Sequence, residues 1–344
     1  MDQIAIEPAE DRRELFEATA RSIKLPFVMI EKDFWVCWTL KHLFEDATIG
    51  PSLIFKGGTS LSKVFRAIER FSEDIDLSIQ RDFLGFTSEN DPQAKDISRT
   101  EKDKRVKNLR QSAKDHVRDT LLPHLLVSFS KALGEASTIW RLEIDEYDAD
   151  VIHFFYPTSR MEGDAPSYVA SAIKLEFGAG SDPYPTGIHL VTPYAAEAFA
   201  GAFKQTTCQV TALEATRTFW EKATLLHAEY HRPPDQATPT RISRHYSDLA
   251  RLAKHPDGIA AAMDIALLER VAAHKSIYFR SGWANYATAH AGSLRLVPQS
   301  SRKAHLIDDY DQMRVMFFAP PPPFNEVLDI LQQLEDTINS RPTI

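Results

Sequence analysis

The sequence is poor in the residues and runs that mark several classes of protein. It has two cysteines, Cys37 and Cys208, in 344 residues, which excludes a disulfide framework and the clustered spacing of a thiolate metal site. Such scarcity favours a reducing compartment, and we expect a cytoplasmic protein. No apolar run approaches the roughly 20 residues that cross a membrane. Residues 1–3 begin no basic, apolar leader, so we expect neither a membrane span nor a signal peptide.

Positive charge is also in short supply, because 40 Lys and Arg residues face 48 Asp and Glu residues, for a net charge of −8. Domains that bind nucleic acid are often basic overall, so any RNA contact would need a local basic face. The candidate is the segment 102–110, whose cations are Lys102, Lys104, Arg105, Lys107 and Arg110. This segment is either a solvated helix face with acidic neighbours or a contact to RNA phosphates.

Residues 54–80 read as strand, glycine turn, helix and strand. Gly57 and Gly58 break an apolar run that ends at Phe55, and glycine permits a sharp turn or a close backbone approach. Apolar residues then recur at the spacing of a helix, at Leu61, Val64, Phe65 and Ile68. After Phe71 the period changes to two, so that Ile75, Leu77 and Ile79 alternate with Asp74, Asp76 and Ser78.

This alternation places Asp74 and Asp76 on one strand face, roughly 7 Å apart along the strand. Two such carboxylates suit magnesium ions that also contact phosphates, because hard cations prefer oxygen ligands. The helix N-terminus behind the glycines offers free N–H groups and a positive dipole end to the same anion. Thr59 or Ser60 can cap its first turn. The stretch therefore predicts a magnesium site for a triphosphate.

The GGTS run at residues 57–60, followed by SxDxD at Ser72, Asp74 and Asp76, resembles the nucleotidyltransferase superfamily related to DNA polymerase beta. Within it, the wording of the chain is similar to the AbiEii/AbiGii toxin family of type IV toxin–antitoxin and phage-abortive systems. The similarity runs nearly end to end, through EKDFWV at 31–36, IKLEFG at 173–178, RTFWEKATLLHAEYHRP at 217–233, RHYSDLARL at 244–252 and DDYDQM at 308–313.

The resemblance implies a set of functional residues. Asp74 and Asp76, with Glu176 as a third acid, would hold two magnesium ions. The nucleotide-binding group would comprise Gly57, Gly58, Thr59, Ser60, Lys63 and Ser72. Lys222 would neutralise the triphosphate, and Asp248 would orient that lysine or contact the base or ribose. The family often has an arginine shortly after the strand of the third acid, where this chain has only Gly-Ala-Gly at 178–180.

Simpler roles stand beside these. Glu176 can pair with Lys174 on a strand face, and Lys222 can be an ordinary exposed helix lysine. Asp248 can pair with Arg244 one helical turn away, an interaction worth tenths of a kcal/mol.

Two further motifs are expected to be structural. His227 and His231 have the spacing of a zinc-binding pair, but no third ligand cluster accompanies them, so we expect no zinc site. The proline run at residues 320–323 is expected to lead stiffly into the last helix rather than to serve as a docking ligand.

The expected fold class is α/β, a nucleotidyltransferase-type mixed sheet with helices followed by a mainly helical C-terminal domain. The prolines at 183, 185 and 193 suggest a boundary, giving a nucleotidyltransferase domain at 1–193 and a helical domain at 194–344 that closes over the site. Helices are expected at 10–22, 30–44, 97–133, 211–230, 241–253 and 324–339. Strands are expected at 141–147, 151–156 and 171–178.

The resemblance implies a toxin that transfers NMP from an NTP to the 3′ end of a tRNA and so arrests growth. Its partner would be a cognate antitoxin encoded next to it, itself a DNA-binding repressor. Two other functions remain open. A small-molecule transferase of the antibiotic-modifying type is favoured by the acidic net charge. A nucleotide-binding protein without catalysis is the second, although such a protein need not keep both Asp74 and Asp76.

Overall fold

The structure is a computed structural model that describes residues 1–135, 139–161 and 170–341. The chain forms two compact units. The first comprises Met1–Val64, Ser72–Asp91 and Lys107–Ala212, and the second comprises Phe65–Phe71, Pro92–Val106 and Leu213–Ile344. These units differ from a single division after residue 193, because strand β7 (Cys208–Leu213) joins the sheet of the first unit. The division of the chain into domains at 193 stays a prediction.

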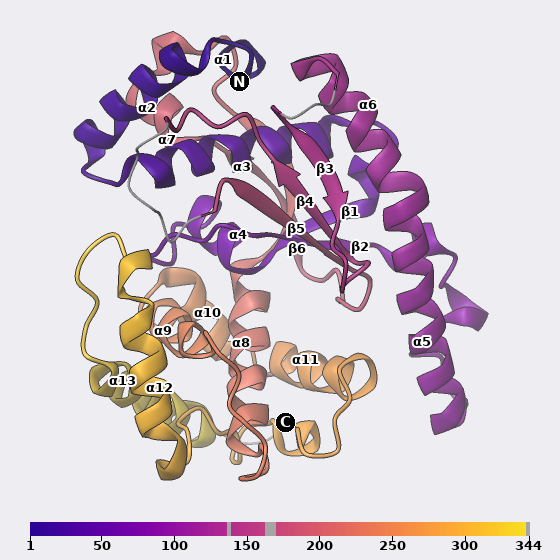
Figure 1. The fold of residues 1–344 in the computed structure, drawn as a ribbon. Helices are drawn as coiled ribbons and strands as arrows, with labels where there is room; N and C mark the ends of the chain where they lie inside the picture. Colours follow the sequence, from indigo (N-terminus) through magenta and orange to yellow (C-terminus); the bar gives the residue numbers. More distant parts are fainter. Residues whose placement is uncertain (136–138, 162–169, 342–344) are drawn as a thin grey trace. The chain divides into compact units, whose positions relative to one another are not determined.

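Within the described residues, a mixed seven-stranded sheet forms the first unit, in the order β3-β4-β5-β2-β1-β7-β6 (Figure 1). Its strands are β1 Leu53–Lys56, β2 Ile75–Ile79, β3 Arg141–Ile144, β4 Val151–Phe155, β5 Ala172–Gly178, β6 Thr186–Val191 and β7. Strand β2 runs antiparallel to β1 and parallel to β5. The central strands therefore come from segments far apart in the sequence.

Alternating burial confirms the strand predicted at 171–178, which is β5. On β5 the side chains of Ile173, Leu175 and Phe177 are buried, while those of Lys174 and Glu176 are half exposed. Strands β6 and β7 were not predicted, and the expectation of mostly helical structure beyond residue 193 was wrong for β7. The helix predicted from residue 211 begins at Ala215, since residues 211–213 still alternate as a strand.

The first unit also contains α1 Asp2–Ala5, α2 Ala9–Ile23, α3 Phe27–Glu45, α4 Gly57–Lys63 and α7 Tyr194–Ala198. Helix α3 packs on the sheet and places Trp35 and Trp38 in its core. The Trp38 ring lies 4.6 Å from Phe129 and 5.7 Å from Phe154 between centroids, in edge-on and stacked contacts. The prediction that this aromatic stripe is core packing is confirmed.

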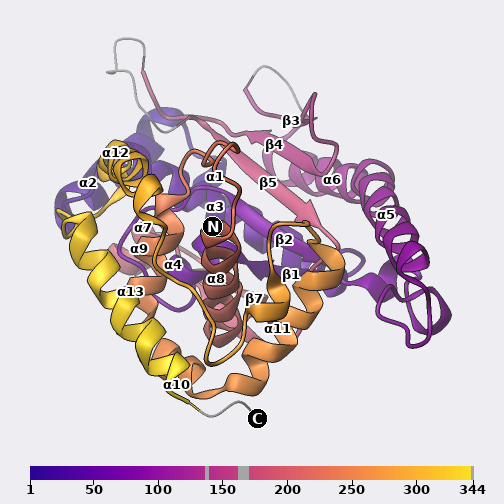
Figure 2. The same ribbon diagram turned by 90° about the horizontal axis from the view of Figure 1, so that it is seen from below.

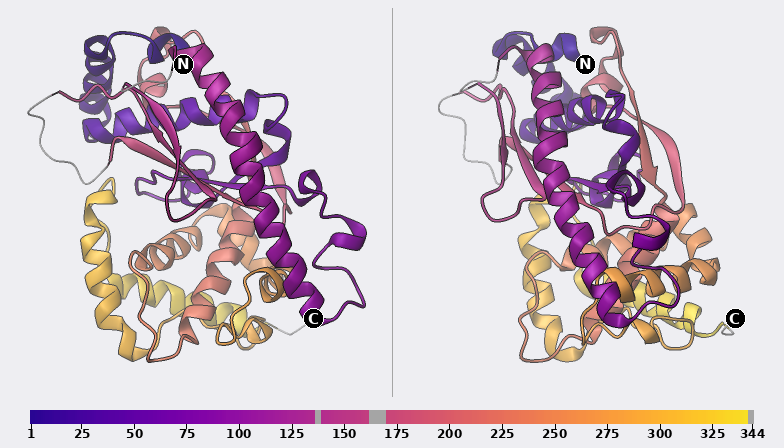
Figure 3. Two further views of the ribbon diagram at one scale, coloured as in Figure 1. Left: turned by 45° about the vertical axis from the view of Figure 1, so that its right-hand side comes forward. Right: turned by 90° about the vertical axis from the view of Figure 1, so that its right-hand side faces the viewer.

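Helix α5 (Arg99–His116) continues through a π-helical turn, Val117–Leu121, into α6 (Leu122–Leu133), as one rod (Figure 3). Pro123 lies in the first turn of α6 and has no N–H to donate to the preceding turn. A wider turn at that point absorbs the missing hydrogen bond without breaking the helix. The helical region predicted at 97–133 is confirmed.

The second unit is helical, with α8 Ala215–Tyr230, α9 Ser243–Leu252, α10 Pro256–Met263, α11 Ile265–Tyr278, α12 Lys303–Gln312 and α13 Phe324–Asn339. Helix α8 contacts α9, α10 and α11, which surround it in Figure 2. The proline run ends at Pro323, the N-cap of α13, as predicted. The predicted fold class is confirmed. No helix of the described ranges is both long and apolar enough to cross a membrane.

The helix after the glycine turn is shorter than predicted. It ends at Lys63, whereas the apolar spacing suggested a helix through Ile68. Arg66 has a φ of 51°, which reverses the chain and directs the next residues into the second unit. There Arg70 forms an isolated antiparallel bridge with Phe317. The apolar residues beyond Lys63 therefore pack as an extended segment, which the helical period could not reveal.

Candidate active site

Asp76 lies in a row of charged residues that crosses three neighbouring strands. It pairs with Lys56 on β1 and with Glu176 on β5. Residues that pair directly across strands place their side chains on the same face of the sheet. The strand register therefore brings Glu176 beside Asp76, and the role of Glu176 as a third acid stays a prediction.

Asp74 lies one residue before β2 rather than within it. Burial raises the pKa of its carboxyl group, and the negative charges of Glu73, Glu176 and Asp76 raise it further. Only the charge of Lys32 acts in the opposite direction among the main causes. The carboxylates thus repel one another, and a bound cation would relieve this repulsion.

Gly57 is required by the position of the Asp76 side chain. Its φ is +81°, and a Cβ atom built on it would lie 2.0 Å from Asp76 Oδ2. Any larger residue would therefore suffer backbone strain and displace this carboxylate. The glycine of the GGTS run serves the acid of the SxDxD run, which explains why the two motifs occur together.

The hydroxyls of Thr59 and Ser60 stabilise the turn. Both residues are buried; Thr59 Oγ1 donates to the carbonyl oxygen of Asp74, and Ser60 Oγ donates to that of Gly57 at 3.0 Å. The prediction that either caps the helix was wrong, because α4 begins at Gly57 with Lys56 as its N-cap. Their place in the nucleotide-binding group, like that of Gly58 and the half-buried Ser72, stays a prediction.

Lys63 lies in a buried ion pair. Its Nζ is 2.7 Å from Asp33 Oδ1 and 3.7 Å from the centroid of the Tyr194 ring. Burial alone would lower the pKa of Lys63, but the charge of Asp33 raises it. Lys63 therefore joins α4 to α3, and its predicted contact with phosphate would require it to leave Asp33.

We call Asp74, Asp76 and Glu176 the acidic row. The EKD run of α3, residues 31–33, is buried, and each of its side chains contacts another segment of the first unit. Asp33 Oδ2 accepts a hydrogen bond from the backbone N–H of Tyr194 at 2.6 Å. Glu31 accepts one from the backbone N–H of Ser159. Lys32 Nζ lies 2.8 Å from Glu73 Oε2. Lys32 and Glu73 are therefore neighbours of the candidate site. In the sequence, Lys32 is marked by three consecutive charged residues within an apolar helix, and Glu73 only by its position next to Asp74.

The donor atoms suit magnesium in kind. Asp74, Asp76 and Glu176 offer only carboxylate oxygens, which hard cations prefer. Over the described residues, however, no three acidic, histidine or cysteine side chains converge on one point that could hold a metal ion. Glu176 Oε1 instead lies 2.5 Å from Lys174 Nζ, and both side chains are 40% exposed. Asp74 and Asp76 are the residues that would hold a magnesium ion, and Glu176 would join them only if it left Lys174.

The second unit contains a buried ionic cluster, formed by Arg70, Lys222 and Asp248. Arg70 Nε and Nη2 donate to the two oxygens of Asp248 at 2.8 Å each, and Lys222 Nζ lies 2.8 Å from Asp248 Oδ2. The exposed fractions are 4% for Arg70, 6% for Lys222 and 1% for Asp248. An ordinary exposed lysine at 222 is therefore excluded.

Two cations share one carboxylate in this cluster. Burial alone would raise the pKa of Asp248, but the charges of Arg70 and Lys222 hold it far below the ordinary value. Burial lowers the pKa of Lys222, an effect that Asp248 offsets and Arg70 reinforces. His245 Nδ1 is 3.4 Å from Lys222 Nζ, and burial together with that charge lowers the pKa of His245 well below its usual range. The cluster thus favours an anion.

Arg70 was not predicted. In the sequence it stands between an apolar stripe and the SxDxD run, where no spacing links it to Asp248. Its partner lies 178 positions away and reaches it only through the folded second unit. Three residues separate Arg70 from Asp74 in the chain, so a short stretch of backbone connects the ionic cluster to the acidic row.

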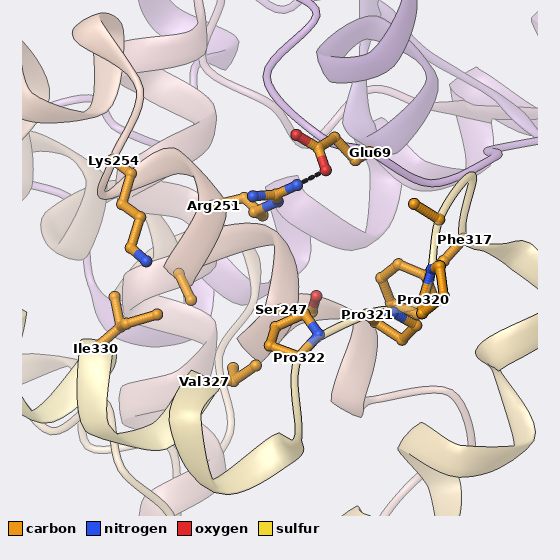
Figure 4. Close-up of a pocket in the computed structure, with 12 residues that line it drawn as sticks. Glu69, Ser247, Arg251, Lys254, Phe317, Pro320, Pro321, Pro322, Val327 and Ile330 are labelled. Atoms are coloured by element: carbon orange, nitrogen blue, oxygen red, sulfur yellow. Dashed lines mark ion pairs between the residues drawn. The ribbon is translucent and has the colours of Figure 1, made fainter.

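A cavity in the second unit is too small to bind a base, and no residue of the ionic cluster lines it. It has a volume of about 60 Å³ and lies between α9, α13 and the prolines at 320–322. Figure 4 shows Arg251 and Glu69 paired at this cavity, with Ser247, Val327 and Ile330 on its walls. A cavity of roughly 150 Å³ is needed to hold benzene. We therefore do not assign the nucleotide to it.

His227 uses both ring nitrogens within the second unit. Nδ1 accepts a hydrogen bond from the backbone N–H of Arg295 at 3.0 Å, and Nε2 lies 3.1 Å from Thr288 Oγ1. Burial and the charge of His231 lower the pKa of His227 to about 4. The histidine thus has a packing role, consistent with the structural reading of this pair.

The sheet order and the helical second unit define a nucleotidyltransferase-type α/β protein. The profile described as "Nucleotidyl transferase AbiEii toxin, Type IV TA system" matches residues 38–330, and the chain belongs to this family. It is accordingly a nucleotidyltransferase toxin of a type IV toxin–antitoxin system, with an antitoxin as its partner.

A solved structure with a similar fold is MenT4, a nucleotidyltransferase toxin from Mycobacterium tuberculosis H37Rv. The TM-score is 0.51 at 13% sequence identity, over 95% of this chain and 90% of that one. Identity this low supports the fold alone. No curated protein matches the chain significantly.

Proposed function

We propose that this toxin transfers NMP from an NTP to the 3′ end of a tRNA, with magnesium held at Asp74 and Asp76. The observation that carries the proposal is the acidic row, where burial and then the repulsion of neighbouring carboxylates raise the pKa of Asp74, and where Gly57 makes room for the Asp76 carboxylate. Carboxylates that repel one another beside a glycine turn form a site for a cation and the phosphates that accompany it.

Magnesium would supply activation of the acceptor hydroxyl and stabilisation of the leaving pyrophosphate. The chain's own part is to hold its oxygen ligands in place. Strand β2 fixes Asp76, the hydroxyl of Thr59 holds the backbone of Asp74, and Lys32 holds the preceding Glu73. Glu176 would complete the ligand set from β5.

The buried ionic cluster would serve the same reaction. Lys222 would neutralise negative charge on the triphosphate as it develops in transfer. Asp248 would position Lys222, and Arg70 would position Asp248, so that neither acid nor arginine needs to contact the nucleotide. The excess of one cation in this cluster and its short link in sequence to Asp74 support this assignment.

One rival function has an observation in its favour. A small-molecule acceptor, as in the antibiotic-modifying nucleotidyltransferases, agrees with the net charge of −8. Nucleotide binding without transfer is the weaker rival, because a binding protein would gain nothing from the repulsion between Asp74 and Asp76.

One labelling experiment separates these functions. Each NTP, labelled at its α-phosphate, is incubated with the protein, Mg²⁺ and either unfractionated tRNA or an aminoglycoside. We expect label in tRNA, and none with the Asp76→Asn variant. Label in the aminoglycoside alone would establish the rival acceptor. A protein that binds NTP but labels neither acceptor would be the silent binding protein.

The cellular part of the proposal concerns growth and the partner. We infer that tRNA modified at its 3′ end no longer accepts an amino acid, which arrests growth of the cell in an abortive response to infection. The site of action would be the cytoplasm, where tRNA and NTP occur. The antitoxin would be a DNA-binding repressor encoded next to the toxin. Expression of the toxin with and without the neighbouring reading frame tests this part, and arrest should occur only without it.

A further inference from the structure

Helix α5 concentrates positive charge in an acidic protein. Its sequence, RTEKDKRVKNLRQSAKDH, contains seven lysines and arginines against three carboxylates, whereas the whole chain has a net charge of −8. Such local excess is the electrostatic mark of a surface for phosphates. None of the residues named in the proposed function would hold the body of the tRNA, so a surface for it has still to be found.

The cations of this helix gather on one side. Lys104, Lys107, Arg110 and Lys114, which we call the basic face, recur at intervals of three and four residues. Another side of the helix is buried and consists of Val106, Leu109 and Ala113. Ten residues of helix rise about 15 Å, so the basic face is a straight track of that length.

The carboxylates of α5 do not neutralise this track. Asp103 lies 3.3 Å from Arg280, and Glu101 Oε1 lies 3.0 Å from Arg105 Nε, so each has a cation outside the basic face. Within the described residues, Lys104 and Lys107 are exposed and form no ion pair. Lys114 Nζ lies 3.9 Å from Asp150 Oδ2, so acidic neighbours balance one end of the basic face and leave Lys104 and Lys107 unbalanced.

We propose that the basic face binds the phosphate backbone of the RNA acceptor, an inference that rests on the proposed function. A track of about 15 Å is long enough to contact several consecutive phosphates of one RNA strand. The exposed residues between the cations are the polar Asn108 and Gln111. A protein partner would favour aromatic residues and few lysines at this position, so the composition favours RNA over an acidic protein.

The test compares two triple variants of the full-length protein. In the first, Lys104→Gln, Lys107→Gln and Arg110→Gln remove charge from the basic face while keeping good helix formers. In the control, Lys24, Lys131 and Lys204, exposed lysines of other segments, are replaced by Gln. Binding of unfractionated tRNA is measured between 50 and 200 mM salt.

We expect the first variant to lose at least tenfold in affinity at low salt, and its log–log salt slope to fall by about two to three, since each released phosphate contact contributes nearly one. The control should keep the wild-type slope. An unchanged slope in the first variant would overturn the inference. So would unchanged tRNA binding together with loss of binding to the purified antitoxin, which would make the basic face a protein contact.

Failure of this inference is distinguishable from failure of the proposed function. If the wild type labels tRNA and both triple variants do so with equal KM, the inference alone is wrong. If the wild type transfers label only to a small molecule, the RNA acceptor is wrong and the inference falls with it. The first variant should keep its stabilisation by NTP and Mg²⁺, because the basic face lies apart in sequence from Asp74 and Asp76.

Discussion

The acidic row of the first unit and the ionic cluster of the second differ in how their charges are balanced. In the acidic row, Asp74 has three carboxylates among the causes that raise its pKa and one lysine against them. In the ionic cluster, Asp248 accepts hydrogen bonds from Arg70 and Lys222 and is almost inaccessible to water. Carboxylates outnumber cations among the charges that shift the pKa of Asp74, whereas two cations share the single carboxylate of Asp248.

This difference separates a site that needs a ligand from one that is already assembled. A buried, paired carboxylate contributes mainly through its partners, and its removal leaves their charges unpaired. Carboxylates that repel one another cost stability until a cation arrives, as is common where function rather than folding decides the residues. We therefore expect substitutions of the acidic row to abolish activity with little loss of stability, and removal of Asp248 from the ionic cluster to destabilise the fold.

The largest expected effect is the loss of transfer in Asp76→Asn. The change is isosteric and removes a proposed metal ligand, so turnover should fall at least about thousandfold, or roughly 4 kcal/mol in the barrier. Thermal stability should stay the same or rise, because one repelling charge is gone. Transfer assays and melting curves check this, with Glu143→Gln on the exposed strand β3 as the control. A folded variant with full turnover would end the metal assignment.

The next effect is on the stability of Asp248→Asn. Arg70 and Lys222 would remain buried without a counter-charge, which should cost roughly 3 kcal/mol of unfolding free energy. Urea unfolding measures this, and Asp311→Asn on the surface should stay within about 0.5 kcal/mol of wild type.

Lys222→Met provides the matched comparison within the cluster, since Arg70 would still neutralise Asp248. This variant should fold with a smaller loss of stability yet lose turnover more than nucleotide binding. Equal destabilisation by Lys222→Met and Asp248→Asn, with normal turnover in the former, would reduce the cluster to a structural role.

A smaller effect is expected at Gly57, where the two motifs meet. Gly57→Ala should cost about 2 kcal/mol, from its positive φ and from displacement of Asp76. Gly85 has a φ of +78° with no atom within 4 Å of its Cβ position, so Gly85→Ala reports the backbone term alone. Only Gly57→Ala should also weaken binding of NTP with Mg²⁺. Equal behaviour of the two alanine variants would remove the link between Gly57 and Asp76.

The smallest effect is the pH dependence that Asp74 contributes. Because the pKa of Asp74 is raised in the folded protein, its contribution to stability is present below the unfolded value of 3.8 and is lost as the pH rises through the folded value. Asp74→Asn removes this loss, so the variant should be slightly more stable than wild type near pH 7. Urea unfolding from pH 4 to 8 should show that the difference in unfolding free energy between the variant and the wild type becomes smaller as the pH falls. A difference that grows as the pH falls would contradict a raised pKa of Asp74.

The sequence predicted the elements whose signal is local. The change of period after Phe71 indicated β2, and the proline run with its apolar stripe indicated α13 to the residue. The GGTS and SxDxD runs lie close together in the sequence and indicated a shared site, and the pairing of Lys56 with Asp76 places Gly57 beside that acid. Long helices that begin directly after a proline, such as α3 after Pro26, could also be predicted from the sequence.

Other features depend on contacts between distant segments, and these could not be predicted. The placement of β7 beside β1 is a matter of sheet order, so its last three residues, 211–213, were predicted as the start of a helix and the strand itself was missed. Arg70 finds Asp248 only in the folded second unit. Lys63 has the sequence position of a phosphate ligand, and only the fold reveals its pairing with Asp33. Charge patterns locate ionisable groups, but not their partners.

The most direct test of the acidic row as a nucleotide site is the melting temperature of the wild-type protein with millimolar NTP and Mg²⁺. Ligand at 100 times its Kd stabilises the folded state by about 2.7 kcal/mol, so the midpoint should rise by several degrees. Chelation of Mg²⁺ should cancel most of this rise, and Asp76→Asn should abolish it. If no NTP stabilises the protein, or if chelator leaves the rise intact, the acidic row does not bind the nucleotide through a metal ion.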